Sequence, residues 1–161
     1  AHIKVAGISV LGINGIKSRI KIPAYGKYLR RLISENHLEG KVRVLGKLSA
    51  EEMKQEYLSS QIFVCPSAVE NSPNSVAEGQ LLGVPVAASR TGGIPDIVKD
   101  GVSGLLFEKG NVHELAACVS RILTDKQLAK ELSASERETA AKLYNGECNY
   151  QKLIEIYQSI G

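Results

Sequence analysis

Two glutamates separated by seven residues, Glu70 and Glu78, carry the clearest chemical signal in the sequence. Ser72 and Pro73 lie between them and form a signal for the start of a helix. Serine can cap free amides, and proline at the first helical position loses only an N–H that has no partner. We therefore expect Glu70 in a loop and Glu78 on the helix that follows.

The first turn of this predicted helix is a candidate site for an anion. The amides of Asn74, Ser75 and Val76 are expected there, without acceptors inside the helix and at the positive end of its dipole. A phosphate group fits such a position. About one turn further on, Glu78 could accept hydrogen bonds from the vicinal hydroxyls of a ribose. Glu70 would then face the group attached beyond the phosphates.

The elements around the two glutamates support this interpretation. The alternative is that both are solvated surface charges, which their placement on either side of a helix start makes the weaker interpretation. Residues 62–65 are an apolar run that Pro66 ends, which predicts a buried strand leading into the loop. A strand, a loop and a phosphate-binding helix in this order describe a nucleotide site at the carboxyl end of a parallel sheet.

The whole chain alternates between strand-like and helix-like segments. This alternation predicts a doubly wound, mostly parallel α/β fold of about five strands, Rossmann-like, with helices on both faces and a helical C-terminus. The expected strands cover residues 2–10, 42–45, 62–65, 84–88 and 104–107. Pairs with capping-box spacing predict helix starts at Ser49 and Glu52, Asn111 and Glu114, Thr124 and Gln127, and Ser133 and Glu136.

Three other segments complete this outline. The mostly apolar residues 2–10 are expected to be buried on both faces of the sheet. A polar loop is expected over residues 11–24, followed by a helix over residues 25–36. Asn145 and Gly146 are expected to break the chain before a final helix.

Composition and charge exclude several classes of partner. The chain has 161 residues and is expected to form one domain over residues 1–161. Its 20 basic and 17 acidic residues are interspersed and leave a net charge of +3, so no charged block argues for nucleic acid. Aromatic residues make up 5%, too few for base-stacking platforms. Cys65, Cys118 and Cys148 lie far apart, which fits a reduced cytosolic compartment.

The sequence offers no pattern for a bound metal. The three histidines, His2, His37 and His113, do not have the spacing of metal ligands, and no Asp-x-Asp occurs. We therefore expect a site without a metal or other cofactor, in which helix amides act as the donors to an anion.

The stretch from Pro66 to Leu115 resembles the donor half of retaining glycosyltransferases of group 1 (family 4), which have the GT-B fold. Their hallmark is a Glu-x7-Glu motif, here Glu70 and Glu78. The sequences GVPV at 83–86, TGGIP at 91–95 and GxxGLL at 101–106 follow in the family's order. Asn71 departs from the glycine of many members, but asparagine tolerates positive φ better than most residues.

This resemblance implies a donor site for a nucleoside-diphosphate sugar. It places Glu70 near the transferred sugar, as the catalytic residue, and Glu78 on the ribose. It places the nucleotide base against Gly46, Lys47 and Leu48, although an ordinary connector explains that segment equally well. Gly92 and Gly93 would allow the backbone to approach the ligand closely.

The resemblance also implies that the chain is a fragment of a two-domain enzyme. The opening strand of this domain, with its phosphate-neutralising arginine and lysine, and the N-terminal acceptor domain are expected outside the chain. The isolated fragment is then expected to be inactive. The full-length enzyme would act on a glycan or lipid-linked acceptor in polysaccharide assembly, in the cytoplasm or peripherally at the inner membrane face.

Two other functions stay open from the sequence. One is a different GT-B enzyme that uses a sugar nucleotide, such as an epimerase or a synthase of the sucrose type. The other is a non-catalytic α/β interaction module of the receiver or flavodoxin type, in which Glu70 and Glu78 would be surface charges. A receiver requires acidic residues at the end of the first strand, where Ser9, Val10 and Leu11 stand instead.

Overall fold

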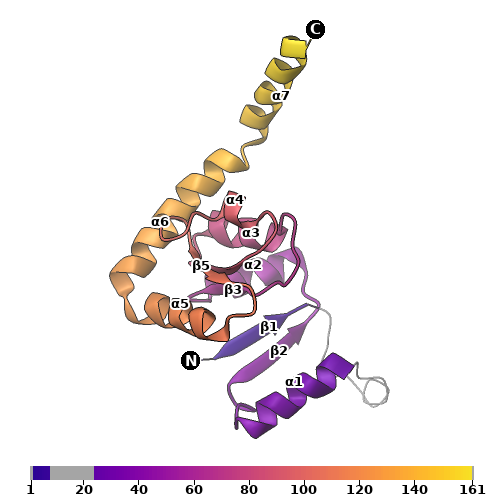
Figure 1. Cartoon of the computed structure of the whole chain (residues 1–161), viewed down its shortest axis with the longest axis vertical. Helices are drawn as coiled ribbons and strands as arrows, with labels where there is room; N and C mark the ends of the chain where they lie inside the picture. The colour runs from indigo at the N-terminus through magenta and orange to yellow at the C-terminus, as the bar shows by residue number, and fades with distance from the viewer. Residues whose placement is uncertain (1, 8–23, 161) are drawn as a thin grey trace. The chain divides into compact units, whose positions relative to one another are not determined.

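The computed structural model describes residues 2–7 and 24–160 (Figure 1). The chain divides into two compact units, Ala1–Gln55 and Glu56–Gly161, and each is described by itself. In the described residues, strands and helices alternate and every strand pair is parallel, as the sequence predicted. The organisation as a single domain stays a prediction.

The first unit contains a pair of strands. β1 (Ile3–Ala6) pairs in parallel with β2 (Val42–Gly46), and α1 (Ala24–Glu35) lies between them in sequence. The predicted strand over residues 2–10 is confirmed for its first part only, since residues 8–10 lie outside the described residues. The prediction of burial on both faces is wrong, because every β1 residue is exposed. An apolar run favours an extended backbone, but burial requires covering layers that the run itself does not specify.

The helix α2 (Ala50–Leu58) begins at the first predicted capping box. The Ser49 hydroxyl accepts a hydrogen bond from the Glu52 amide at 3.3 Å. The Ser49 amide in return donates to the Glu52 carboxylate at 2.8 Å. This local exchange stabilises the helix start and confirms the prediction.

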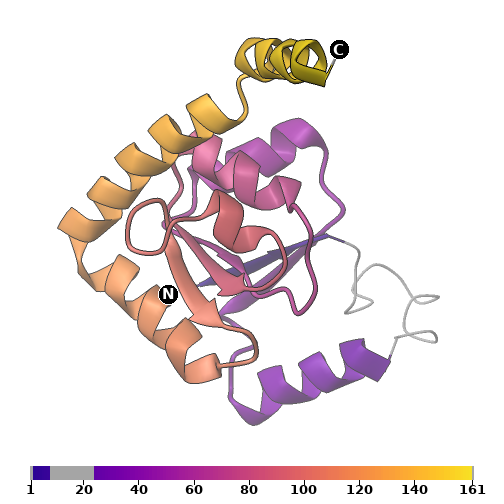
Figure 2. The ribbon, with the colours of Figure 1, turned by 45° about the horizontal axis from the view of Figure 1, so that its top comes forward.

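The second unit is built on a sheet of three parallel strands. They are β3 (Phe63–Cys65), β4 (Val86–Arg90) and β5 (Leu105–Glu108), in that spatial order. α3 (Asn74–Leu82) connects β3 to β4, and α4 (Ile94–Ile97) connects β4 to β5. The chain continues through α5 (Val112–Thr124) and α6 (Lys126–Leu143) into α7 (Gly146–Ile160), as Figure 2 shows.

Alternating residues of β4 and β5 separate the core of this unit into two layers. Because successive strand residues point to opposite faces, Val86 and Ala88 face one layer and Ala87 the other. The first layer joins the sheet to α3 and α4, and the second joins it to α5 and α6. The members are Cys65, Val76, Val86, Ala88, Ile94, Ile97, Val98 and Leu106 in the first layer, and Ala87, Leu105, Phe107, Ile122 and Leu132 in the second. Helices thus cover both faces of this sheet.

The predicted helix starts after β5 have different outcomes. Asn111 caps α5 by accepting from the amides of His113 and Glu114, as predicted. α6 begins one residue later than predicted, because Asp125 and not Thr124 is its cap, accepting from the Leu128 amide. The break before α7 is confirmed.

The predicted helix start at Ser133 and Glu136 is wrong, because both residues lie inside α6 and bind the start of β4 or the residues just before it. The Ser133 hydroxyl donates to the Gly83 carbonyl at 2.7 Å. The Glu136 carboxyl group accepts from the Val86 amide at 2.9 Å. Glu136 is fully buried, and burial raises its pKa to about 8 although the bond from Val86 acts in the opposite direction.

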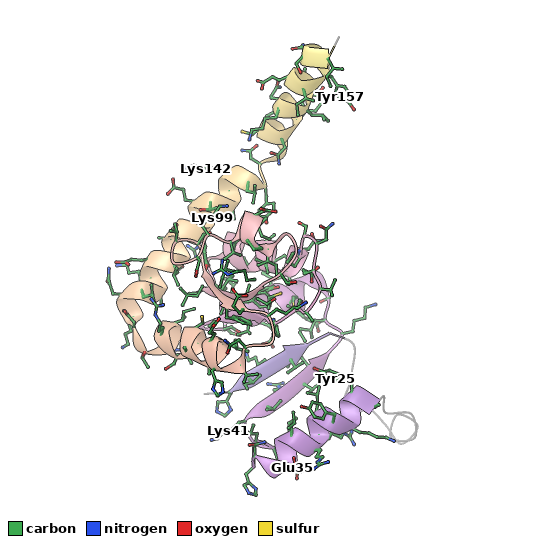
Figure 3. All side chains as sticks on the ribbon, viewed as in Figure 1. Tyr25, Glu35, Lys41, Lys99, Lys142 and Tyr157 are labelled. Carbon is green, nitrogen blue, oxygen red and sulfur yellow. The ribbon has the colours of Figure 1, made fainter. Side chains whose placement is uncertain are left out.

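The C-terminal helix α7 contributes no side chain to the core. None of its residues is buried, and Tyr157, labelled in Figure 3, is 67% exposed. In the described part of the chain, no helix combines the length and the apolar character needed to cross a membrane.

Candidate functional site

The candidate site lies in the second unit, at the edge where the parallel strands end. β3 ends at Cys65, and residues 66–73 follow it as a loop that leads into α3. β4 ends at Arg90, and residues 91–93 lead from it into α4. Since β3 and β4 are parallel neighbours, both loops leave the sheet at the same edge. This is the edge at which the sequence predicted a site.

Hydrogen bonds from two hydroxyl groups hold the loop that carries Glu70 at the end of β4. The buried Ser89 hydroxyl donates to the Ser67 carbonyl at 2.6 Å, and the Thr91 hydroxyl donates to the Ala68 carbonyl at 3.3 Å. The Ser67 hydroxyl in turn donates to the Glu70 carboxylate at 3.3 Å. The half-buried Glu70 is therefore oriented from within its own loop, and the loop is held by the neighbouring strand.

Gly92 and Gly93 bring the turn after β4 directly against the Glu70 loop. A Cβ atom on Gly92 would collide with the Glu70 carbonyl oxygen, and one on Gly93 would collide with the Asn71 carbonyl oxygen. Gly92 also has a φ of +52°, which side chains rarely adopt. The close approach predicted for these glycines is thus made to the loop backbone, and their contact with a ligand stays a prediction.

The helix after the loop starts one residue later than predicted. α3 begins at Asn74, with Pro73 as its N-cap in an extended conformation and without a side-chain cap. The Pro73 carbonyl accepts from the Val76 amide at 3.0 Å, so the prediction that the Val76 amide lacks an acceptor is wrong. Helices often tighten their first turn in this way.

The amides of Asn74 and Ser75 remain as donors in this turn. Within the described part of the chain, neither has a hydrogen-bond acceptor. Asn74 is exposed and Ser75 half-buried, so an anion could approach this end of α3. The exposed Glu78 follows on the same helix, as the sequence predicted.

Tyr57, at the end of α2, is a residue near this site that the sequence analysis missed. Its hydroxyl donates to the Ser75 carbonyl at 2.9 Å. Burial raises the pKa of Tyr57, and the neighbouring Glu78 carboxylate raises it further by its charge and by hydrogen bonding. An aromatic residue on a mostly polar helix was the available signal, but its partner lies 18 residues further along the chain.

Other polar groups link the elements around this sheet. Gln80 is fully buried and donates to the Ile97 and Ser103 carbonyls, both at 3.1 Å, which joins α3 to the segment after α4. Arg90 forms ion pairs with Asp100 at 2.9 Å and with Glu108 at 3.0 Å. The arginine at the end of β4 is therefore already engaged by two carboxylates.

Gly46, Lys47 and Leu48, the segment predicted to contact a base, belong to the first unit. Gly46 ends β2 with a φ of +75°, and its carbonyl accepts from the Gly7 amide at 2.8 Å. Lys47 is exposed and Leu48 is half-buried. Their assignment to a nucleotide base stays a prediction.

In the residues that the structure describes, no group of three or more potential metal-binding side chains gathers.

Comparison with known proteins identifies related sequences and folds. The family model described as "Glycosyl transferases group 1" matches residues 7–139. The sulfoquinovosyl transferase SQD2 of Arabidopsis thaliana is 35% identical over 100 residues, which are 60% of this chain and 20% of that protein. This chain therefore spans a minor part of that relative's length.

Two solved structures share the fold. Anabaena Alr3699/HepE, crystallised in complex with UDP, superposes with a TM-score of 0.80 at 21% identity, over 98% of this chain and 49% of that one. The C-terminal domain of a group 1 family protein (LpcC) from Francisella tularensis superposes with a TM-score of 0.71 at 15% identity, over 88% and 86% of the two chains.

Proposed function

The chain belongs to the group 1 glycosyl transferases, and we propose that it supplies the donor site of a retaining enzyme that uses a nucleoside-diphosphate sugar. The observation that carries this proposal is the arrangement at the carboxyl edge of the β3–β4–β5 sheet. The amides of Asn74 and Ser75 have no acceptors in the described part of the chain. In sequence they lie between two carboxylates, Glu70 in the loop and Glu78 on α3.

Each part of this arrangement has a task in sugar transfer. The reaction breaks the anomeric C–O bond to the diphosphate and forms a new bond to an acceptor hydroxyl. The Asn74 and Ser75 amides stabilise the negative charge that develops on the departing phosphate. Glu78 accepts hydrogen bonds from the ribose hydroxyls, and Glu70 contacts the transferred sugar. The fastened loop keeps Glu70 in place while charge develops on the sugar.

The partners follow from the same chemistry. UDP is the first nucleotide to test, because the Anabaena relative was crystallised with it. The acceptor, a glycan or a lipid-linked sugar in polysaccharide assembly, would bind through a domain outside this chain. The proposal requires no metal or other cofactor and no nucleic acid, and it places the enzyme in the cytoplasm or peripherally on the inner membrane face.

Titration of the chain with UDP, GDP and ADP, followed by amide chemical shifts, tests the proposal. We expect one of the three to shift the resonances of residues 70–78, with the same affinity in the presence of EDTA. A loss of more than about tenfold in EDTA would contradict metal independence. No shift near these residues with any nucleotide would favour the interaction module over the donor site.

The two glutamates are expected to respond differently to substitution. A hydrogen bond to a charged group contributes about 1.5 to 3 kcal/mol, so Glu78→Ala should weaken the preferred diphosphate by about tenfold to a hundredfold. Glu70→Ala should leave this affinity nearly unchanged, because its partner is the sugar. In the full-length enzyme, Glu70→Ala should instead depress turnover strongly. Calorimetry and steady-state kinetics measure the two effects.

Glu155, exposed on α7, provides the matched control. Glu155→Ala removes the same charge from the chain and should change neither affinity nor turnover. Equal losses of diphosphate affinity in the Glu70 and Glu78 variants, or a larger loss for Glu70, would overturn the assignment of roles.

A further inference from the structure

Tyr57 connects the end of α2 to the functional end of α3. Its side chain is 3% exposed, and its ring packs edge-on against Phe63 with a centroid distance of 5.2 Å and an interplanar angle of 68°. This packing holds the ring without using the hydroxyl group. The position of the hydroxyl is therefore set by the core and not by the contacts that it makes.

The hydroxyl lies against one face of the first turns of α3. It donates its one proton to the Ser75 carbonyl at 2.9 Å. Ser75 and Glu78 are three residues apart on the helix, so they share a face. A helical carbonyl has a second lone pair, so it can accept the Tyr57 bond in addition to its helical one. The hydroxyl keeps its proton and remains a donor at neutral pH, because the ordinary pKa of tyrosine is about 10 and burial raises it further in Tyr57.

We infer that Tyr57 is a positioning residue that directs Glu78 toward the ribose of the donor nucleotide. Its hydroxyl holds the Ser75 peptide in the first turn of α3, on the helix face that also carries Glu78. This inference rests on the proposed donor function. It adds a determinant of specificity, since a Glu78 held in one orientation discriminates between nucleotides that have a ribose 2′-hydroxyl and nucleotides that lack it.

The experiment compares UDP with 2′-deoxy-UDP on the wild-type chain and on Tyr57→Phe. Phenylalanine keeps the ring packed against Phe63 and removes only the hydroxyl. We expect Tyr57→Phe to weaken UDP by about threefold to tenfold and to weaken 2′-deoxy-UDP less, so that the preference for UDP shrinks. If another diphosphate binds best to the wild type, that nucleotide and its 2′-deoxy form replace this pair.

Tyr144 offers the matched control. Its hydroxyl is buried and has no hydrogen-bond partner among the described residues, so Tyr144→Phe makes the same chemical change without breaking a contact. It should alter neither affinity nor the preference for the ribonucleotide. The double variant Tyr57→Phe with Glu78→Gln tests whether Tyr57 acts through Glu78. In the Glu78→Gln background, Tyr57→Phe should no longer change the preference.

The outcomes separate this inference from the proposed function. A wild-type chain that binds no nucleoside diphosphate would overturn both. Wild-type binding with an unchanged preference in Tyr57→Phe, or with equal loss for the ribo and deoxy forms, would overturn the role of Tyr57 and leave the donor site standing. Thermal unfolding of each variant identifies any loss that comes from instability, and Tyr57→Phe is then compared at a temperature where it is fully folded.

Discussion

The two ends of β4 are held in different ways. At its carboxyl end, the Ser89 hydroxyl and the close backbone contact of Gly92 and Gly93 fasten the loop that carries Glu70. At its amino end, side chains of α6 hold the start of the strand and the residues before it, among them the buried carboxyl of Glu136.

The difference separates a contact that depends on shape from one that depends on charge. No titratable side chain takes part in the described contacts that fasten residues 67 and 68 to β4, so these contacts do not change with pH. The close backbone contact of Gly92 and Gly93 at the same end is lost when a side-chain atom is added to either glycine. The amino end depends instead on the protonation of Glu136. The loop that carries Glu70 is thus held at β4 by hydrogen bonds that do not depend on pH.

The largest effect is expected at the carboxyl end, from Gly92→Ala. The new methyl group would collide with the Glu70 carbonyl oxygen, and the residue would have to keep a positive φ. Positive φ costs about 1 to 2 kcal/mol and overpacking about 1 to 3 kcal/mol, so the free energy of unfolding should fall by about 2 to 5 kcal/mol. Urea denaturation measures this change.

Gly110→Ala separates the two contributions to that loss. Gly110 has a φ of +80°, and no atom lies within 4 Å of the position that a methyl group would take, so only the backbone cost applies. It should lower the free energy of unfolding by about 1 to 2 kcal/mol. If both variants lose the same amount, the collision with the Glu70 loop contributes nothing, and the proposed contrast between the ends of β4 fails at its carboxyl end.

The next effect is expected at the amino end, from pH. In the folded chain the pKa of Glu136 is about 8, above the ordinary value of 4.5, so the folded state binds this proton more tightly. Its contribution to stability is therefore complete below about pH 4.5 and is lost as the pH rises to about 8. We expect a loss of about 4 kcal/mol across this window, because each unit between the two pKa values corresponds to about 1.4 kcal/mol.

Glu136→Gln provides the comparison for that measurement. Glutamine has a similar shape and can accept the bond from the Val86 amide, but it does not ionise. Urea denaturation at several pH values should show the wild type losing stability relative to Glu136→Gln as the pH rises. Parallel profiles for the two chains would show that this carboxyl does not control the amino end of β4.

The smallest effect compares one serine at each end. Ser89 is 1% exposed, so Ser89→Ala would leave the Ser67 carbonyl without its donor and should cost about 1 to 2 kcal/mol. Ser133 is half-buried, and water can replace its bond to the Gly83 carbonyl, so Ser133→Ala should cost about 0.5 to 1 kcal/mol. Hydrogen exchange should speed up over residues 66–73 in the Ser89 variant only. Faster exchange there in both variants would contradict the separation of the two ends.

The family, the GT-B fold and the order of strands and helices could be predicted from the sequence. These features depend on motifs and periodicity within short segments. The capping pairs show that a motif predicts a contact only when both partners are close in sequence. Asn111 and Glu114 form a cap because all partners are local, whereas Ser133 and Glu136 have the same spacing but bind Gly83 and Val86, each 50 residues away.

In the candidate site, too, the features that depend on neighbouring residues could be predicted, and most of those that depend on distant segments could not. The sequence placed Glu70 in a loop and Glu78 on a helix after β3, since both follow from the helix start between them. It missed Tyr57 and the collision that makes Gly92 necessary, because both depend on which segments the sheet brings together. The acceptor of the Val76 amide was missed for a local reason, the tightened first turn of α3.

The fit between Gly92, Gly93 and the loop at residues 70 and 71 has a consequence for the exchange of parts between relatives. A loop of different backbone shape, grafted from another member of the family, would meet a turn after β4 that is shaped for the original. Residues 66–73 and 89–93 therefore form one transplantable module although residues 74–88 separate them in the sequence. Chimeras that carry both segments should fold where chimeras with the loop alone do not.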